Sequence, residues 1–279
     1  MSNDVNQQII EEFRGTEGRV GGPFEGGRLV LLTTTGARSG APHTVPVGYL
    51  PDLGGRIHVI ASAGGAPRHP DWYHNLLADP RATVETGLFT YDARATALEG
   101  ADRDTVFARA VEADPGWGEY ETKAARTLPV VALDPVTAGP PPVPGGPGDK
   151  LVAIHALFRR ELELIRKEVT ASGSTVGAQL RVNCLTLCEG LGNHHAGEEQ
   201  GMFPVLESEA PGLTPALNML REEHRVIRRL LDDLQAVLAG GRPDPADLAA
   251  EVERLTTEVE AHLDHEEDRL VTILNSPAG

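Results

Sequence analysis

The sequence has few cysteines, few aromatic residues and no long apolar run. Its only two cysteines, Cys184 and Cys188, stand four residues apart. That spacing is neither a C-x-x-C redox motif nor a secreted disulfide framework, so we expect buried thiols. No apolar stretch approaches the roughly 18 residues of a membrane-spanning helix, and the first residues, MSNDVNQQIIEEF, do not resemble a signal peptide. These absences favour a soluble, cytoplasmic protein.

Basic residues are also scarce. The chain has 25 Lys and Arg against 41 Asp and Glu, which gives a formal net charge of −16. A surface of this sign repels the phosphates of nucleic acids and of anionic lipids. We therefore expect no nucleic-acid partner and no membrane partner, and a small molecule as the reaction partner.

The length of the chain and one unusual segment predict two domains. A chain of 279 residues with 40% apolar residues can fill two ordinary cores. The segment AGPPPVPGGPGD, residues 138–149, is almost wholly Pro and Gly, which suits neither a helix interior nor a sheet ladder. We predict a first domain over 1–137, a linker over 138–149 and a second domain over 150–279.

The first domain carries short β-branched runs separated by Gly and Pro, the pattern of an antiparallel barrel. Spacing typical of helices occurs at Val5–Phe13, Pro70–Ala78 and Asp102–Val111. The pattern predicts an α+β fold with a small β-barrel. The expected strands are Leu29–Thr35, Thr44–Leu50, Ile57–Ser62, Ala82–Glu85, Tyr91–Leu98 and Leu128–Leu133.

The second domain has apolar residues at three- and four-residue spacing over long stretches. These stretches run over about 150–170, 175–206, 214–239 and 245–274, with short polar connections. Four amphipathic helices joined by short loops predict an all-α, up-down four-helix bundle.

Histidines occur on every predicted helix of the bundle. His194 with Glu198, and His262 with Glu266, are spaced i and i+4, so each pair shares a helix face. Either pair alone is typical of a solvated surface. Together with single histidines on the other two helices, His155 and His224, they form a set that suits two iron-like ions bridged by carboxylate.

The register on the second helix stays open at this point. His195 with Glu199 is an alternative to the pair His194 and Glu198. Adjacent helical residues lie about 100° apart, so we expect only one of the two histidines to face the interior well.

The stretch H-H-A-G-E-E-Q-G-M-F-P resembles the second-helix signature of the hemerythrin-like, His-His-Glu cation-binding family, and the resemblance covers nearly all of 150–275. It implies a carboxylate-bridged di-iron site, with Glu199 and Glu267 as neighbours of the ligands. Oxygen-carrying hemerythrins have a second ligand four residues along the third helix, where this chain has Arg228, which cannot bind a metal. The departure favours a reactive site with an open position over simple oxygen carriage. The implied ligands are His155, His194, Glu198, His224, His262 and Glu266.

Two clusters in the first domain suit a phosphorylated, planar cofactor. The strand-turn sequence L-L-T-T-T-G-A-R-S-G-A-P-H places Arg38 and Ser39 between Gly36 and Gly40, so the loop offers exposed amides and a cation to a phosphate. A second cluster, I-A-S-A-G-G-A-P-R-H-P-D-W-Y-H-N, combines a glycine turn with the start of a helix. Its aromatic residues suit either a heterocycle pocket or core packing.

Both clusters, with the closing Y-E-T-K-x-x-R-x-L-P-V-V-x-L-D-P-V, resemble the deazaflavin-dependent nitroreductase family over about residues 20–136. The resemblance implies a split β-barrel of the flavin-reductase and pyridoxamine-oxidase type, a homodimer, and the 5-deazaflavin coenzyme F420. It implies hydride transfer from the reduced cofactor to a quinone or nitroaromatic. The implied cofactor contacts are Arg38, Ser39, Gly40, Thr44, Val45, Pro46, Val47, Gly48, Tyr49, Ile60, Ala61, Ser62, Ala63, Asp71, Trp72, Tyr73, His74, Asn75 and Trp117.

The substrate side departs from the family pattern. Trp117 and Tyr120 match positions where nitro-reducing members carry tyrosines, and Asp114 occupies another such position. The hydroxyls of Tyr49, Ser62 and Tyr120 are candidates for a hydrogen bond to the ring or a proton to the acceptor. With Trp117 they form the predicted catalytic set.

The fusion of the two domains suggests how they work together. A deazaflavin transfers hydride and reacts poorly with dioxygen, whereas a reduced di-iron pair reduces dioxygen readily. We expect an oxidase in which reduced cofactor supplies electrons to the di-iron site for reduction of dioxygen or peroxide. Two alternatives are a quinone or nitro-compound reductase with a separate oxidant- or iron-binding bundle, and a sensor of dioxygen or nitric oxide.

Overall fold

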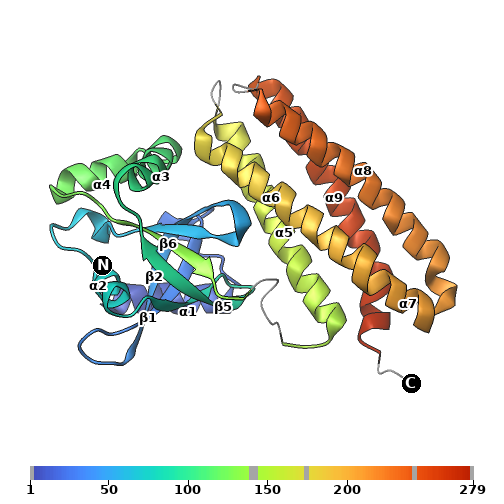
Figure 1. The fold of residues 1–279 in the computed structure, drawn as a ribbon, viewed down its shortest axis with the longest axis horizontal. Helices are drawn as coiled ribbons and strands as arrows, with labels where there is room; N and C mark the ends of the chain where they lie inside the picture. Colours follow the sequence, from blue (N-terminus) through green and yellow to red (C-terminus); the bar gives the residue numbers. More distant parts are fainter. Residues whose placement is uncertain (1–2, 138–143, 173–175, 241–243, 277–279) are drawn as a thin grey trace. The chain divides into compact units, whose positions relative to one another are not determined.

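The computed structural model describes residues 3–137, 144–172, 176–240 and 244–276. The chain divides into two compact units (Figure 1). The first comprises Met1–Pro142 with Gly177–Gln179, and the second comprises Val143–Val176 with Leu180–Gly279.

The first unit contains a closed barrel of six antiparallel strands in the order β1-β2-β3-β6-β5-β4. Alternate residues of each strand point inward, so Val30, Leu32 and Val59 meet in a dry interior. This confirms the predicted split-barrel class, and all six predicted strands are present. Their bounds are β1 Leu29–Thr35, β2 Pro42–Pro51, β3 Ile57–Ile60, β4 Arg81–Glu85, β5 Thr90–Ala97 and β6 Val130–Pro135.

Four helices surround the barrel (Figure 1): α1 Asn3–Gly15, α2 Asp71–Ala78, α3 Gly100–Ala113 and α4 Gly116–Ala124. Helix α3 packs Val106 and Phe107 over the outer side of β3 and β6, while α1 packs Phe13 over β1. Helix α4 was not predicted, because its sequence GWGEYETKA has two glycines and little apolar periodicity. Three short 3-10 turns complete the unit: η1 Gly22–Phe24, η2 Leu53–Gly55 and η3 Ala63–Gly65.

The second unit is a bundle of long helices (Figure 1), which confirms the predicted all-α class. Its core includes Leu162, Leu191 and Leu263, none of which is exposed. Both cysteines are buried as expected, and burial raises the pKa of Cys188 to about 12. The elements are α5 Pro147–Ala171, α6 Ala178–Gly197, the π-helical turn η4 Glu198–Met202, α7 Phe203–Glu209, the 3-10 turn η5 Pro211–Leu213, α8 Thr214–Ala239 and α9 Pro245–Leu274.

The expected linker falls partly outside the described residues, which omit 138–143. Helix α5 already begins at Pro147, so the last three residues of the expected linker are helical. Proline suits the first turn of a helix, because the N–H groups there have no acceptor within the helix. Asp149 accepts a hydrogen bond from the N–H of Gly146 and so caps the start of α5. Among the helices in the described ranges, none is long and apolar enough to cross a membrane.

Candidate functional site

Seven buried or nearly buried side chains meet inside the bundle in two groups. One group is all imidazole, and the other mixes imidazole and carboxylate. Within each group the potential ligand atoms lie within 4.8 Å of one another. The first group, the three-imidazole group, consists of His195, His224 and His262; the second, the mixed group, consists of His155, His194, Glu198 and Glu266.

The two carboxylates connect the groups. Glu198 lies 2.9 Å from Nε2 of His194 in the mixed group and 3.5 Å from Nε2 of His224 in the three-imidazole group. Glu266 lies 3.5 Å from Nε2 of His155 and 3.6 Å from Nε2 of His262. Each glutamate therefore stands between the two groups, the position of a bridging ligand.

Several potential metal-ligand atoms at the centre lack hydrogen-bond partners among the described residues. They include Nε2 of His195, His224 and His262 and the carboxylate oxygens of Glu198 and Glu266. Buried polar atoms are rarely left unpaired, because each costs about 1–3 kcal/mol. Bound cations satisfy convergent lone pairs of this kind, so these residues fit metal binding by nitrogen and oxygen ligands.

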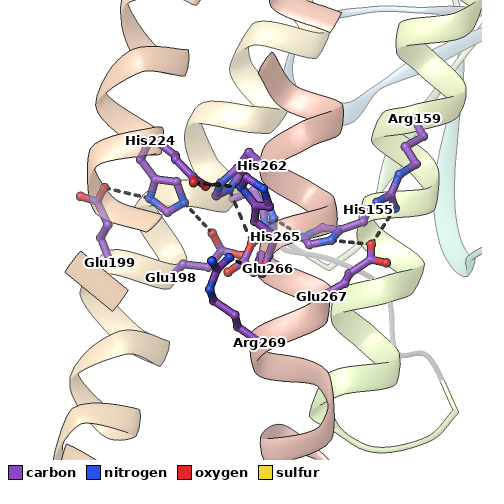
Figure 2. Close-up of polar contacts among 12 residues, drawn as sticks. His155, Arg159, Glu198, Glu199, His224, His262, His265, Glu266, Glu267 and Arg269 are labelled. Carbon is purple, nitrogen blue, oxygen red and sulfur yellow. Dashed lines mark hydrogen bonds and ion pairs between the residues drawn. The ribbon is translucent and has the colours of Figure 1, made fainter. Parts of the chain in front are cut away.

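The rings are held from behind by carboxylates. Nδ1 of His224 lies 2.9 Å from Glu199, and Nδ1 of His155 lies 2.9 Å from Glu267 (Figure 2). Nδ1 of His262 lies 2.9 Å from Glu223. Bonding at Nδ1 leaves Nε2 of each ring directed into the site.

Burial favours the neutral form of His194, His195 and His224. It lowers the pKa of His194 to about 4 and that of His224 to about 3, and it also lowers the pKa of His195. Burial together with the nearby charge of Glu266 raises the pKa of Glu198 well above its usual range. Neutral imidazoles are the form that binds divalent cations.

Both adjacent histidines of α6 enter the site, which corrects the expectation that only one would. Because the site has two halves, the angle of about 100° between neighbouring residues sends His194 to one half and His195 to the other. The alternative partner Glu199 instead bonds to His224. His195 is thus the second imidazole that α6 supplies and completes the three-imidazole group. Arg228 on α8 lies largely exposed, 3.9 Å from Glu199.

Aromatic rings close the site against the core. Phe203 stacks on His224 with centroids 5.6 Å apart, and Phe158 lies 5.3 Å from His194. Phe203 follows the π turn η4, in which its N–H bonds to the carbonyl of Glu198. The extra residue of a π turn rotates the helix locally, so Glu198 and Phe203 both face inward.

In the barrel, the turn between β1 and β2 carries the predicted phosphate contacts. Arg38, Ser39 and Gly40 are exposed there, and Gly40 has a φ of +68°. The side chain of Asn75 on α2 ties this turn down by accepting from the N–H of Ala37 and donating to Thr34. Asn75 is therefore buried and engaged in positioning the turn.

The second predicted loop, after β3, contains three successive residues with positive φ: Ala63, Gly64 and Gly65. Arg126, just beyond α4, holds this loop by donating to backbone carbonyls. Lys123 adds a bond of 3.2 Å to the carbonyl of Gly64. The Arg126 acceptors are the carbonyls of Ala61, Ser62, Ala66 and Arg68, at 3.1 to 3.3 Å. Neither cation was predicted as a site residue, although both stand in the K-x-x-R of the closing motif.

Helix α4 brings the predicted substrate-side aromatics to strand β2. The rings of Trp117 and Tyr120 meet edge to face at 6.1 Å. Trp117 also lies over Gly48, 3.7 Å from where a Cβ on that glycine would stand. Trp117 thus lies between Tyr120, a predicted catalytic residue, and Gly48, a predicted cofactor contact.

Other predicted cofactor residues lie partly or wholly in the barrel core. Trp72 is 7% exposed and packs in the interior cluster. The partly buried side chains of Val45, Val47, Tyr49 and Tyr73 pack against the same cluster. Of the two roles suggested by the sequence, core packing therefore fits Trp72. The remaining predicted contacts stay predictions: Thr44 and Pro46 on β2, Ile60 at the end of β3, and Asp71 and His74 on α2.

Comparison with known proteins agrees with both halves. A family model described as F420H(2)-dependent quinone reductase matches residues 6–135, and one described as hemerythrin HHE cation binding domain matches residues 147–274. An F420H(2)-dependent quinone reductase of Mycobacterium tuberculosis is 34% identical over 125 residues, which are 43% of this chain and 83% of that protein.

Two solved structures are also similar to the chain. The F420-H2 dependent reductase FDR-A is 41% identical, with a TM-score of 0.36, over 38% of this chain and 94% of that one. A structure described as a domain-swapped dimer is 36% identical, with a TM-score of 0.37, over 47% of this chain and 95% of that one.

The barrel and the bundle site together define an oxidoreductase joined to a cation-binding helical domain. The chain belongs to the F420H(2)-dependent quinone reductase family, and its C-terminal half is a hemerythrin HHE domain. Both resemblances noted in the sequence are confirmed.

Proposed function

We propose that this protein is a reduced-deazaflavin-dependent oxidase whose bundle holds a carboxylate-bridged pair of iron ions. The observation that carries the proposal is the position of Glu198 and Glu266 between two groups of buried imidazoles. This arrangement is joined in one chain to a member of an F420H(2)-dependent family. The ligands we assign are the six predicted residues and His195.

The chemistry balances in electrons. When both groups are bound, reduced deazaflavin would supply a hydride, which is two electrons and a proton, and a pair of iron ions would take up the two electrons. These two electrons, with the hydride's proton and a second proton from solvent, would convert dioxygen to hydrogen peroxide, or hydrogen peroxide to two water molecules. The acceptor is therefore dioxygen or a peroxide.

The residues of the barrel would orient the cofactor. The turn around Arg38 and Ser39 offers a cation and amide donors to a phosphate, and the loop held by Arg126 offers backbone amides to the ring system. Tyr120, 40% exposed beside Trp117, is the hydroxyl best placed to meet solvent and an acceptor.

The proposal is tested by air oxidation of the reduced cofactor. Iron-loaded protein and anaerobic reduced deazaflavin are mixed, air is admitted, and the absorbance of oxidised cofactor is followed. We expect fast oxidation in the natural protein and slow oxidation in a double variant, His194→Ala with Glu198→Ala. Equal rates in the two proteins would refute the assigned role of the bundle.

A second candidate function is quinone reduction by the barrel, with the bundle acting separately. It is favoured by the relatives, which are named quinone reductases. In that case the same double variant turns over a quinone such as menadione at the natural rate under nitrogen. Loss of quinone turnover in the double variant would argue against separate roles for the barrel and the bundle.

A further inference from the structure

Three glutamates outside the two metal groups each support a histidine on a different helix. Each stands next to a metal-group residue in the sequence, yet its carboxylate reaches across the bundle. The contacts run from η4 to α8, from α8 to α9, and from α9 to α5, in one direction around the bundle. The pairs are Glu199 with His224, Glu223 with His262, and Glu267 with His155, each at 2.9 Å from Nδ1.

These contacts fix the tautomer of each ring. A carboxylate can only accept, so Nδ1 must carry the proton and donate it. Nε2 is then a bare lone pair. In His224 and His262 this atom is buried and lacks a hydrogen-bond partner among the described residues. The contacts within the protein therefore leave these rings in the tautomer that binds a metal through Nε2.

The three carboxylates also lie partly open to solvent. The side chains of Glu199, Glu223 and Glu267 are 30%, 24% and 24% exposed, so they are not fully desolvated. Arg159 contacts Glu267 at 2.6 Å, and His265 contacts Glu223 at 3.0 Å. A charge behind an imidazole makes its other nitrogen a stronger metal donor.

We propose that Glu199, Glu223 and Glu267 are positioning residues that preset three imidazoles for metal and raise the affinity of the centre. The inference rests on the proposed metal centre and adds to it a ring of cross-helix supports. It also explains the paired acidic residues of the sequence: in Glu198-Glu199 and Glu266-Glu267, the first member faces the centre and the second supports a neighbouring helix.

The tautomers can be measured without metal. In the full chain labelled with ¹⁵N-histidine and stripped of metal, nitrogen shifts report which ring nitrogen carries the proton. We expect protonated Nδ1 and bare Nε2 for His155, His224 and His262. In Glu223→Gln, whose amide can present either an oxygen or an NH2 group, His262 should lose this single tautomer. Protonated Nε2 on these rings in the natural protein would overturn the inference.

Affinity gives the second readout, with Co²⁺ as the probe. We expect each of Glu199→Gln, Glu223→Gln and Glu267→Gln to bind Co²⁺ more weakly, with a dissociation constant about 10- to 100-fold higher than that of the natural protein. The matched control is Glu222→Gln, whose exposed carboxylate pairs only with Arg225 among the described residues and should bind as the natural protein does.

The outcomes separate the two proposals. If the natural protein binds no Co²⁺, the metal centre itself is wrong. If it binds Co²⁺ and Glu223→Gln binds equally well, or Glu222→Gln loses as much, only the positioning role is wrong. Thermal unfolding of each metal-free variant shows whether the bundle has kept its fold.

Discussion

A carboxylate oxygen of Glu198 lies within 4.8 Å of one of Glu266, and the two residues are 4% and 0% exposed. Two buried like charges at this separation repel each other, which is why burial and Glu266 raise the pKa of Glu198. A cation between them removes both the repulsion and the unpaired lone pairs.

Metal binding should therefore stabilise the bundle. At a free metal concentration of 100 times the dissociation constant, one site adds about 2.7 kcal/mol to the free energy of unfolding. Thermal unfolding with and without Fe²⁺ or Co²⁺ under nitrogen measures this. An unchanged midpoint at saturating metal would contradict the assignment.

His195 should be required for full metal loading. Its Nε2 belongs to the three-imidazole group and lacks a hydrogen-bond partner among the described residues. We expect His195→Ala to retain only one of the two ions per chain after dialysis. Elemental analysis checks this, with Glu222→Gln as the control, since that exposed carboxylate lies outside both metal groups and pairs with Arg225. Two retained ions in His195→Ala would show that the imidazole is not a ligand.

The metal-free protein should lose stability as the pH falls from about 6.5 toward 4. The unfolded chain protonates its histidines near pH 6.5, whereas burial lowers the folded-state pKa of His194 to about 4 and that of His224 to about 3. The unfolded state then binds more protons than the folded state, so acid favours unfolding. The cost is about 1.4 kcal/mol per pH unit for each excess proton.

The carboxyl of Glu198 changes the pH dependence of stability in the opposite direction. The raised pKa of Glu198 lets the folded state keep a proton that the unfolded chain releases above roughly pH 4.3. Several histidines outweigh this one carboxyl, so the net effect is destabilisation by acid. Urea unfolding of metal-free protein at pH 7.5 and 5.5 gives the sign, and greater stability at pH 5.5 would show that the carboxyl dominates.

Arg126 should matter for cofactor binding although it was not among the predicted contacts. Arg126→Ala removes the donors to four carbonyls of the loop over 61–68. We expect oxidised F420 to bind about 10-fold more weakly or worse, because losing roughly 1.4 kcal/mol of loop positioning has that effect. Fluorescence titration measures it. Arg81→Ala, which removes a cation bonded to Asp79 on an exposed site, should bind normally.

The two tryptophans should respond differently to truncation. Trp72→Ala opens a cavity in the barrel core and should cost about 3–5 kcal/mol of stability. Trp117→Ala, on the partly exposed α4, should cost less but raise the KM for cofactor or acceptor. Urea unfolding and steady-state kinetics separate the effects. Near-natural stability of Trp72→Ala with lost cofactor affinity would assign Trp72 to the pocket instead.

Strands and bundle helices were predictable because their signals are local. Alternating β-branched runs marked every barrel strand, and the i, i+4 spacing placed His194 and Glu198 on one face. The role of His195 was not predictable from helical spacing alone, because the site has two halves and adjacent residues of α6 reach different halves. Glu223 was missed because its contact with His262 spans 39 residues and leaves no periodic trace. The homodimer and the cytoplasmic location stay predictions.

The central claim, that reduced deazaflavin gives its electrons to the iron pair, is tested most directly without oxygen. Ferric-loaded protein is mixed with excess reduced F420 under nitrogen, and oxidised cofactor and ferrous iron are both measured. We expect one oxidised cofactor for every two ferric ions reduced, and no such reaction in His194→Ala with Glu198→Ala. If the cofactor is oxidised only after a quinone is added, the iron pair is not its electron acceptor.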